Sequence, residues 1–89
     1  MAAILLVSHE VKEFDSWKKG FDGDASNRTA AGLEFLFLAR DAAKPNLIHI
    51  GFKAPSTEAA GAFVSNPRLR ETMEKLGVVG MPDIRMGNI

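Results

Sequence analysis

The fold is decided by the stretch LEFLFLA (residues 33–39), together with LIHIGF (47–52) and AILLV (3–7). A strand with one solvated face alternates apolar and polar residues, whereas these three segments are apolar almost throughout. A chain of 89 residues has enough material to cover one face of a sheet with helices. The second apolar face needs another cover, and the simplest is a second copy of the chain. The pattern therefore predicts a homodimer that assembles through a sheet face.

Helical spacing connects these strands. Phe14, Trp17 and Phe21 predict a first helix after the first strand, with a kink or break near Gly23 because glycine destabilises a helix interior. A second helical region follows Pro55, and Asn66-Pro67 begins a new helical segment within it. A short last strand is expected at about residues 83–87.

This order predicts an α+β fold of the ferredoxin-like βαββαβ type, with a four-stranded antiparallel sheet. Right-handed crossovers place the helices on one face of that sheet. Residues 1–89 are expected to form a single domain. Two alternatives stay open for the last strand, which can pair within its own chain or reach across to the dimer partner.

The turn between residues 41 and 46 fixes the pairing register of the two strands that it joins. The register in turn decides which side chains lie on each face of the sheet. If these residues close a hairpin, Phe37 lies opposite Ile50 and Leu38 lies opposite His49. This register predicts Phe37 beneath the helices and places Leu36, Leu38 and His49 on the open face. That face would be apolar in the middle with polar groups around it.

Composition excludes several classes of function. Eleven basic and eleven acidic residues cancel, and the open face lacks the basic, aromatic surface of an RNA-recognition sheet, so no nucleic-acid partner is expected. No apolar run approaches the roughly 20 residues of a membrane span, so no membrane partner is expected either. The chain has no cysteine, which removes disulfides and thiolate chemistry and fits a cytoplasmic protein.

Several stretches resemble a known family. The segments from His9 to Trp17, Arg40-Asp41 and residues 44–46 are similar to those of dimeric α+β barrel proteins, most closely the antibiotic-biosynthesis-monooxygenase-like small proteins. The resemblance spans nearly the whole chain. It implies two sheets packed face to face, with a ligand cavity between sheet and helices or inside the barrel. The superfamily includes cofactor-free monooxygenases, polyketide cyclases, lactone isomerases, haem-binding enzymes and proteins without known activity.

The two histidines are the candidate chemical groups. His9 ends the first strand and is the candidate general base; its alternative role is a hydrogen bond to the following turn or to Asp15. His49 in mid-strand is expected to be a bonded core or interface residue, and it is a candidate ligand contact. With strands one and three assumed parallel, the two imidazoles of one chain lie too far apart to share a metal. A site shared across the dimer stays open, although no carboxylate–histidine spacing supports it. No metal and no cofactor are predicted.

Four further residues are candidate ligand contacts. Trp17 belongs to an apolar helical stripe and is expected to pack in the core, with its indole N–H facing a cavity as the functional alternative. Arg28 either extends toward solvent or reaches into a cavity as an anion clamp. Leu36 and Leu38 would line the open face. The predicted function is a homodimer that binds a small apolar or aromatic metabolite, either as a cofactor-independent monooxygenase or related enzyme, or as a non-catalytic ligand-binding or structural dimer.

Overall fold

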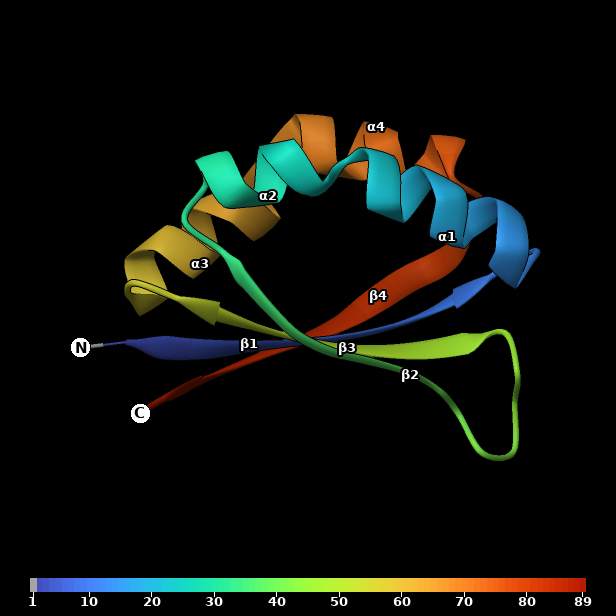
Figure 1. Ribbon diagram of the computed structural model, residues 1–89, viewed down its shortest axis with the longest axis horizontal. Helices are drawn as coiled ribbons and strands as arrows, with labels where there is room; N and C mark the ends of the chain where they lie inside the picture. Colours follow the sequence, from blue (N-terminus) through green and yellow to red (C-terminus); the bar gives the residue numbers. More distant parts are fainter. Residues whose placement is uncertain (1) are drawn as a thin grey trace.

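The computed structural model describes residues 2–89 as one sheet and one helical layer (Figure 1). The elements, in chain order, are β1 (Ala3–Val11), α1 (Phe14–Gly23), α2 (Ala25–Ala30), β2 (Glu34–Arg40), β3 (Leu47–Ala54), α3 (Thr57–Ser65), α4 (Pro67–Lys75) and β4 (Val78–Asn88). The strand order across the sheet is β2-β3-β1-β4, and each neighbouring pair is antiparallel. The predicted ferredoxin-like α+β fold is therefore confirmed.

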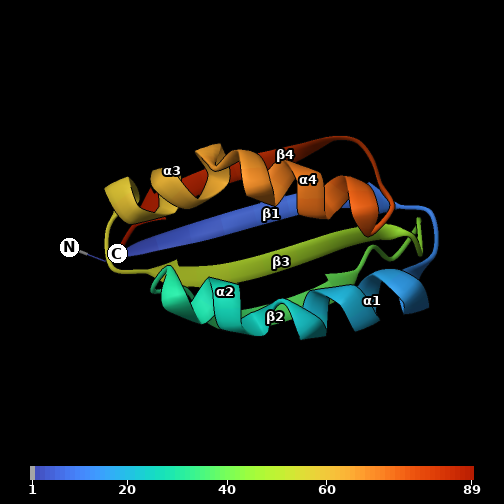
Figure 2. The same cartoon turned by 90° about the horizontal axis from the view of Figure 1, so that it is seen from above.

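All helices of the described chain lie on one face of the sheet (Figure 1). Seen from above, α1 and α2 run over the β2–β3 side, whereas α3 and α4 run over the β1–β4 side (Figure 2). The last strand is longer than predicted, with 11 residues, and it pairs with β1 of its own chain. Pairing within the chain is thus the alternative that the structure adopts.

Local chemistry explains where the helices begin and end. The Ser56 side chain accepts a hydrogen bond from the backbone N–H of Ala59 and caps α3. Asn66 caps α4 in the same way, with Pro67 in the first turn. The expected break near Gly23 divides the first helical region into α1 and α2 at Asp24.

The core lies between the sheet and the helices. Along β1, buried positions alternate with more exposed ones, so only one face of this strand is enclosed. Leu5, Ile48 and Trp17 are fully buried on the covered side. The other buried apolar residues are Ala3, Val7, Val11, Phe21, Leu33, Ile50, Phe52, Ala54 and Ala60.

The predicted hairpin register is wrong beyond Phe35. Phe35 pairs with Phe52 as expected, but a β-bulge then inserts one residue, so Phe37 pairs with Gly51 and Leu38 pairs with Ile50. An extra residue reverses the faces of every side chain that follows it, because side chains alternate with period two. Leu38 therefore packs against the core, and Phe37 lies on the open face with 45% of its surface exposed.

The assumed orientation of β1 and β3 is also wrong. The two strands are antiparallel, with Ser8 opposite His49 and His9 opposite Ile48. His9 and His49 consequently lie near each other along the strands but on opposite faces of the sheet. The two imidazoles of one chain cannot share a metal because they lie on opposite faces of the sheet. The reason given from the sequence, a long separation along the strands, does not apply.

Candidate functional site

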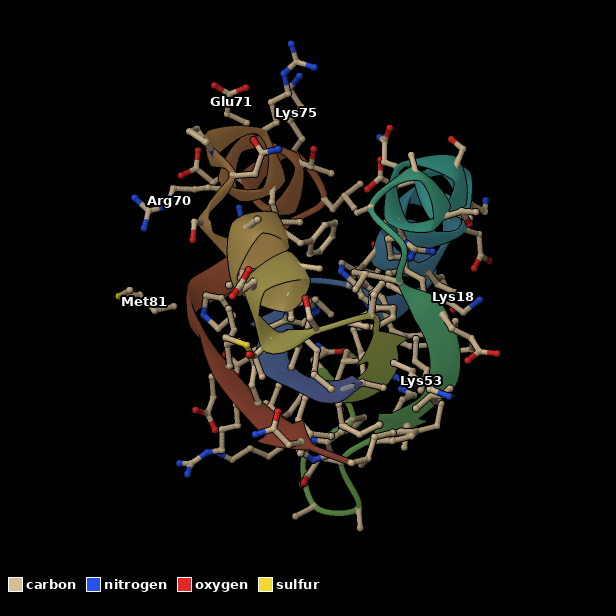
Figure 3. The ribbon with its side chains drawn as sticks, turned by 90° about the vertical axis from the view of Figure 1, so that its left-hand side faces the viewer. Lys18, Lys53, Arg70, Glu71, Lys75 and Met81 are labelled. Atoms are coloured by element: carbon tan, nitrogen blue, oxygen red, sulfur yellow. The ribbon has the colours of Figure 1, made fainter. Side chains whose placement is uncertain are left out.

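A pocket lies between the covered face of the sheet and the two pairs of helices. Its cavity volume is about 50 Å³, and it opens to solvent on one side. The charged side chains of Lys18, Arg70, Glu71 and Lys75 point away from the molecule (Figure 3). The lining residues are Val7, His9, Trp17, Phe21, Asp24, Arg28, Ile50, Phe52, Phe63, Val64, Leu69, Thr72, Met73, Leu76 and Ile84.

His9 is the most unusual polar group in this pocket. Strand β1 directs it beneath the helices, where only 5% of its surface is exposed. Neither ring nitrogen has a hydrogen-bond partner within residues 2–89, so the expected alternative of a bond to the turn or to Asp15 is wrong. Burial lowers the pKa of His9 to about 4, and the imidazole is neutral at physiological pH. A buried polar group without a partner costs about 1–3 kcal/mol, which marks a place where a ligand group can bind.

An aromatic row connects His9 to the second helix. The His9 ring meets Trp17 edge-on, with ring centroids 5.2 Å apart, and Trp17 stacks on Phe21 at 4.9 Å. Trp17 is 1% exposed, as expected for a core residue, and it also lines the pocket, as its alternative role requires. The row supplies a rigid apolar wall for a ligand.

Arg28, on α2, lies at the other end of this aromatic row, next to Phe21. Its guanidinium carbon lies 3.7 Å from the centroid of the Phe21 ring and 5.9 Å from that of Phe52. Only 8% of the residue is exposed, so the favoured expectation that Arg28 extends toward solvent is wrong. Burial lowers the pKa of Arg28, and the carboxylates of Asp24 and Asp22 act in the opposite direction. The break between α1 and α2 turns this arginine inward.

The structure brings three of the predicted site residues together: His9, Trp17 and Arg28. Leu36, Leu38 and His49 do not line this pocket. Leu36 is half exposed at the bulge of β2, and Leu38 packs against the core. Leu36 and His49 remain predictions for a ligand held between the sheets of a dimer.

His49 takes part in a separate network on the open face. Its Nδ1 atom lies 2.9 Å from the Ser8 hydroxyl, and its Nε2 atom lies 2.9 Å from Asp41 Oδ1. Because the Asp41 carboxylate can only accept, Nε2 donates to it, and Nδ1 of the neutral ring accepts from Ser8. The hydrogen bond from His49, followed by those from the backbone of Lys44 and Ala43, lowers the pKa of Asp41. The expectation of a bonded histidine is confirmed for His49.

The helices over the β1–β4 side also contribute to the pocket. Phe63 of α3 and Met73 and Leu76 of α4 are among its lining residues. Leu76 reaches across to α1, where a Cβ atom on Gly20 would collide with it. Gly20 therefore marks this close approach in the sequence, because a Cβ atom there would force the Leu76 side chain to shift.

Residues 2–89 contain no group of three or more His, Asp or Glu side chains placed to hold a metal ion. None of their helices is long and apolar enough to cross a membrane.

Comparison with solved structures finds the same fold in several proteins. A Bordetella bronchiseptica protein provisionally named an antibiotic biosynthesis monooxygenase is 12% identical, with a TM-score of 0.79 over 99% of this chain and 96% of that one. A Caulobacter crescentus protein with the same provisional name is 14% identical, with a TM-score of 0.75 over 99% and 89% of the two chains.

A mutant form of SnoaB, a cofactor-independent oxygenase from Streptomyces nogalater, is 13% identical. It gives a TM-score of 0.72 over 99% of this chain and 92% of that one. No family model and no curated protein matches the chain. The chain thus has the ferredoxin-like α+β fold of the antibiotic-biosynthesis-monooxygenase-like proteins, as the sequence resemblance predicts.

Proposed function

We propose that this chain is a homodimeric protein that binds a small apolar or aromatic molecule above the sheet and oxidises it with O2 without a cofactor. The observation that carries the proposal is His9, a neutral imidazole with two unpaired nitrogens in a pocket lined mostly by apolar residues. The fold shared with SnoaB, a cofactor-independent oxygenase, adds support at the level of architecture only.

His9 would act first as a hydrogen-bond acceptor for an acidic O–H or C–H of the ligand. In the free protein its pKa of about 4 makes it a weak base. An anion formed beside the imidazole favours the protonated ring and raises that pKa, so proton transfer becomes easier as the charge develops.

The oxidation itself would use the electron-rich anion. One electron passes from the substrate anion to O2, and the resulting radical pair combines to a peroxide. Loss of water from that peroxide leaves a carbonyl, so that a CH2 group and one O2 become C=O and H2O. The proton taken by His9 leaves with the water, and the imidazole returns to its neutral form.

The homodimer would assemble through the open face of the sheet. Leu6 and Phe37 lie there with 42% and 45% of their surfaces exposed, which is costly for apolar residues of this size. Around them are both acids, such as Glu34 and Asp83, and bases, such as Lys53. A face with an apolar centre and charges of both signs suits a second copy of itself, related by a two-fold axis.

Sedimentation tests the dimer. Wild-type protein at low micromolar concentration is expected to sediment as a dimer, and Phe37→Asp is expected to shift it to monomer because an unpaired charge would enter the interface. Met81→Asp is the matched control, since Met81 on β4 is 85% exposed and points away from the molecule (Figure 3). A monomeric wild type, or equal effects of the two variants, would contradict the proposal.

Oxygen uptake tests the reaction. Hydroxylated aromatic compounds that carry an acidic ring CH2 group would be screened for substrate-dependent O2 consumption in metal-free buffer. His9→Gln is expected to lower kcat by about 10²–10⁴-fold, the usual contribution of a general base. Lys18→Gln, on the outer side of α1, is expected to leave it unchanged. Normal turnover by His9→Gln would remove His9 from the mechanism.

The alternative is a dimer that binds its ligand without turning it over. The low pKa of His9 favours this reading, because a neutral imidazole is a good acceptor and a poor base. Binding of aromatic compounds without any O2 consumption across the screen would support it.

A further inference from the structure

Arg28 is a buried cation without a counter-ion in contact. No side-chain hydrogen bond or salt bridge of this residue is found within residues 2–89, although only 8% of its surface is exposed to solvent. Stacking on Phe21 compensates part of the lost hydration, because an aromatic face attracts a guanidinium. A stacked guanidinium still has its N–H groups free in the plane of the fork, and these are the groups that bind anions.

The neighbouring acids do not occupy this site. Asp22 forms a salt bridge with Lys18 at 2.7 Å on the outer side of α1. Asp24 lines the pocket, but its Oδ1 atom accepts a hydrogen bond from Asn27 at 2.5 Å. Thr72 is the remaining polar lining residue, and it is uncharged. The pocket is therefore lined by one cation, Arg28, and by one carboxylate, Asp24, which is bonded to the neutral Asn27 amide and has no hydrogen bond to Arg28 among the described residues.

His9 and Arg28 lie at the two ends of one aromatic row. The order Arg28, Phe21, Trp17, His9 follows from the successive ring contacts along it. A ligand beside this row meets a fixed positive charge at one end and a neutral hydrogen-bonding imidazole at the other. The walls between them are apolar, with Phe63 and Met73 opposite.

We propose that the ligand is an aromatic acid, with a carboxylate bound by Arg28 and a hydroxyl directed at His9. A carboxylate fits the guanidinium fork in plane and supplies the missing counter-ion. The flat apolar body lies along the Trp17 side of the pocket, and the weakly acidic hydroxyl faces the unpaired imidazole. This inference rests on the proposed function for the use of the hydroxyl, and on the unpaired Arg28 for the carboxylate.

The test compares two probes of one shape. 6-Hydroxy-2-naphthoate and its neutral carboxamide would be titrated by calorimetry into wild-type protein under anaerobic conditions, so that no turnover is needed. We expect the acid to bind at least about tenfold more tightly than the amide, as one partly buried ion pair would give. Equal binding of the two probes, or no binding of the acid, would overturn the inference.

Variants assign the preference to a residue. Arg28→Gln is expected to reduce the acid-to-amide ratio to near one, and Arg28→Lys to retain part of it. The control is Arg40→Gln, because Arg40 also stacks on an aromatic ring, 4.3 Å from Phe14, but does not line the pocket. A preference unchanged in Arg28→Gln would overturn the assignment. The comparison of the acid with the amide uses wild-type protein only. It therefore tests the inference even if Arg28→Gln does not fold.

The same experiment separates this inference from the proposed oxidation. Selective binding of the acid without O2 consumption would support the aromatic-acid ligand and contradict the proposed oxidation. O2 consumption with neutral phenols, without preference for the acid, would keep the enzyme and remove the role of Arg28.

Discussion

The two faces of the sheet each carry one histidine, and these two differ in burial and in hydrogen bonding. His9 and His49 come from paired strands one register position apart, yet His9 faces the helices and His49 faces away from them. His49 is half exposed and bonded at both nitrogens, whereas His9 is buried and bonded at neither. On the open face, both nitrogens of His49 have hydrogen-bond partners. On the covered face, neither nitrogen of His9 has one within residues 2–89. A polar group without a hydrogen bond costs more free energy when it is buried than when it is exposed to water. The unpaired His9 therefore indicates that a ligand is recognised on the covered face.

The largest expected contrast is between two neighbouring leucines of β1. Leu5→Ala on the covered face is expected to lower the free energy of unfolding by about 2–5 kcal/mol, because Leu5 is completely buried. Leu6→Ala on the open face is expected to act on assembly, so its effect should grow with protein concentration while that of Leu5→Ala stays constant. Denaturant unfolding at several concentrations measures both. Equal costs that do not depend on concentration would break the contrast.

The next contrast concerns pH. His9 has a pKa near 6.5 when unfolded and about 4 when folded, so its stability contribution is complete above pH 6.5 and is lost as the pH falls toward 4. The loss is expected to reach about 3 kcal/mol, from about 1.36 kcal/mol for each pKa unit. For Asp41, whose folded pKa is also lowered, the loss comes at lower pH, below its ordinary 3.8.

Urea unfolding between pH 7 and pH 4 checks this difference between the histidines. His9→Leu is expected to flatten the pH dependence in that window, and His49→Gln is expected to retain it. A steep dependence that survives in His9→Leu would show that another group is responsible.

A smaller contrast compares two glycines of α1. A Cβ at Gly20 collides with Leu76, whereas nothing lies within 4 Å of the Cβ position at Gly23. Gly20→Ala is expected to destabilise by about 1–2 kcal/mol, since overpacking outweighs the gain in helix propensity of about 1 kcal/mol. Gly23→Ala is expected to be neutral or slightly stabilising. Thermal unfolding of both variants checks the difference in sign, and a stabilised Gly20→Ala would contradict the close helix contact.

The smallest expected effect lies in the open-face network. Ser8→Ala removes the hydrogen bond to His49 and is expected to cost about 1 kcal/mol, because the imidazole can bond to water instead. The measurement is the chemical shift and tautomer of His49 by NMR together with the unfolding free energy. An unchanged tautomer fits the structure, because Asp41 still holds Nε2.

Much of the architecture could be predicted from the amino-acid sequence. The apolar strands around Phe37 and Ile50, the helical stripe through Trp17 and the break near Gly23 are local patterns, and each is confirmed. Local patterns fix local structure because strand and helix periodicity depend on residues two to four positions apart. His9 is a candidate site residue because of its position at the end of the first strand and the family resemblance, and Trp17 because of its place in the helical stripe.

Only the tertiary structure decided how these elements face one another. The β-bulge at Leu36 reverses Phe37 and Leu38, and no local pattern marks it, because both faces of the strand are apolar. The inward turn of Arg28 likewise depends on Phe21 and Phe52 arriving from other elements to stack with it. The sequence by itself determined the elements, their order and the apolar character of both sheet faces. The pairing of strands decided which histidine is enclosed, since one position in register separates a bonded surface imidazole from an unpaired buried one.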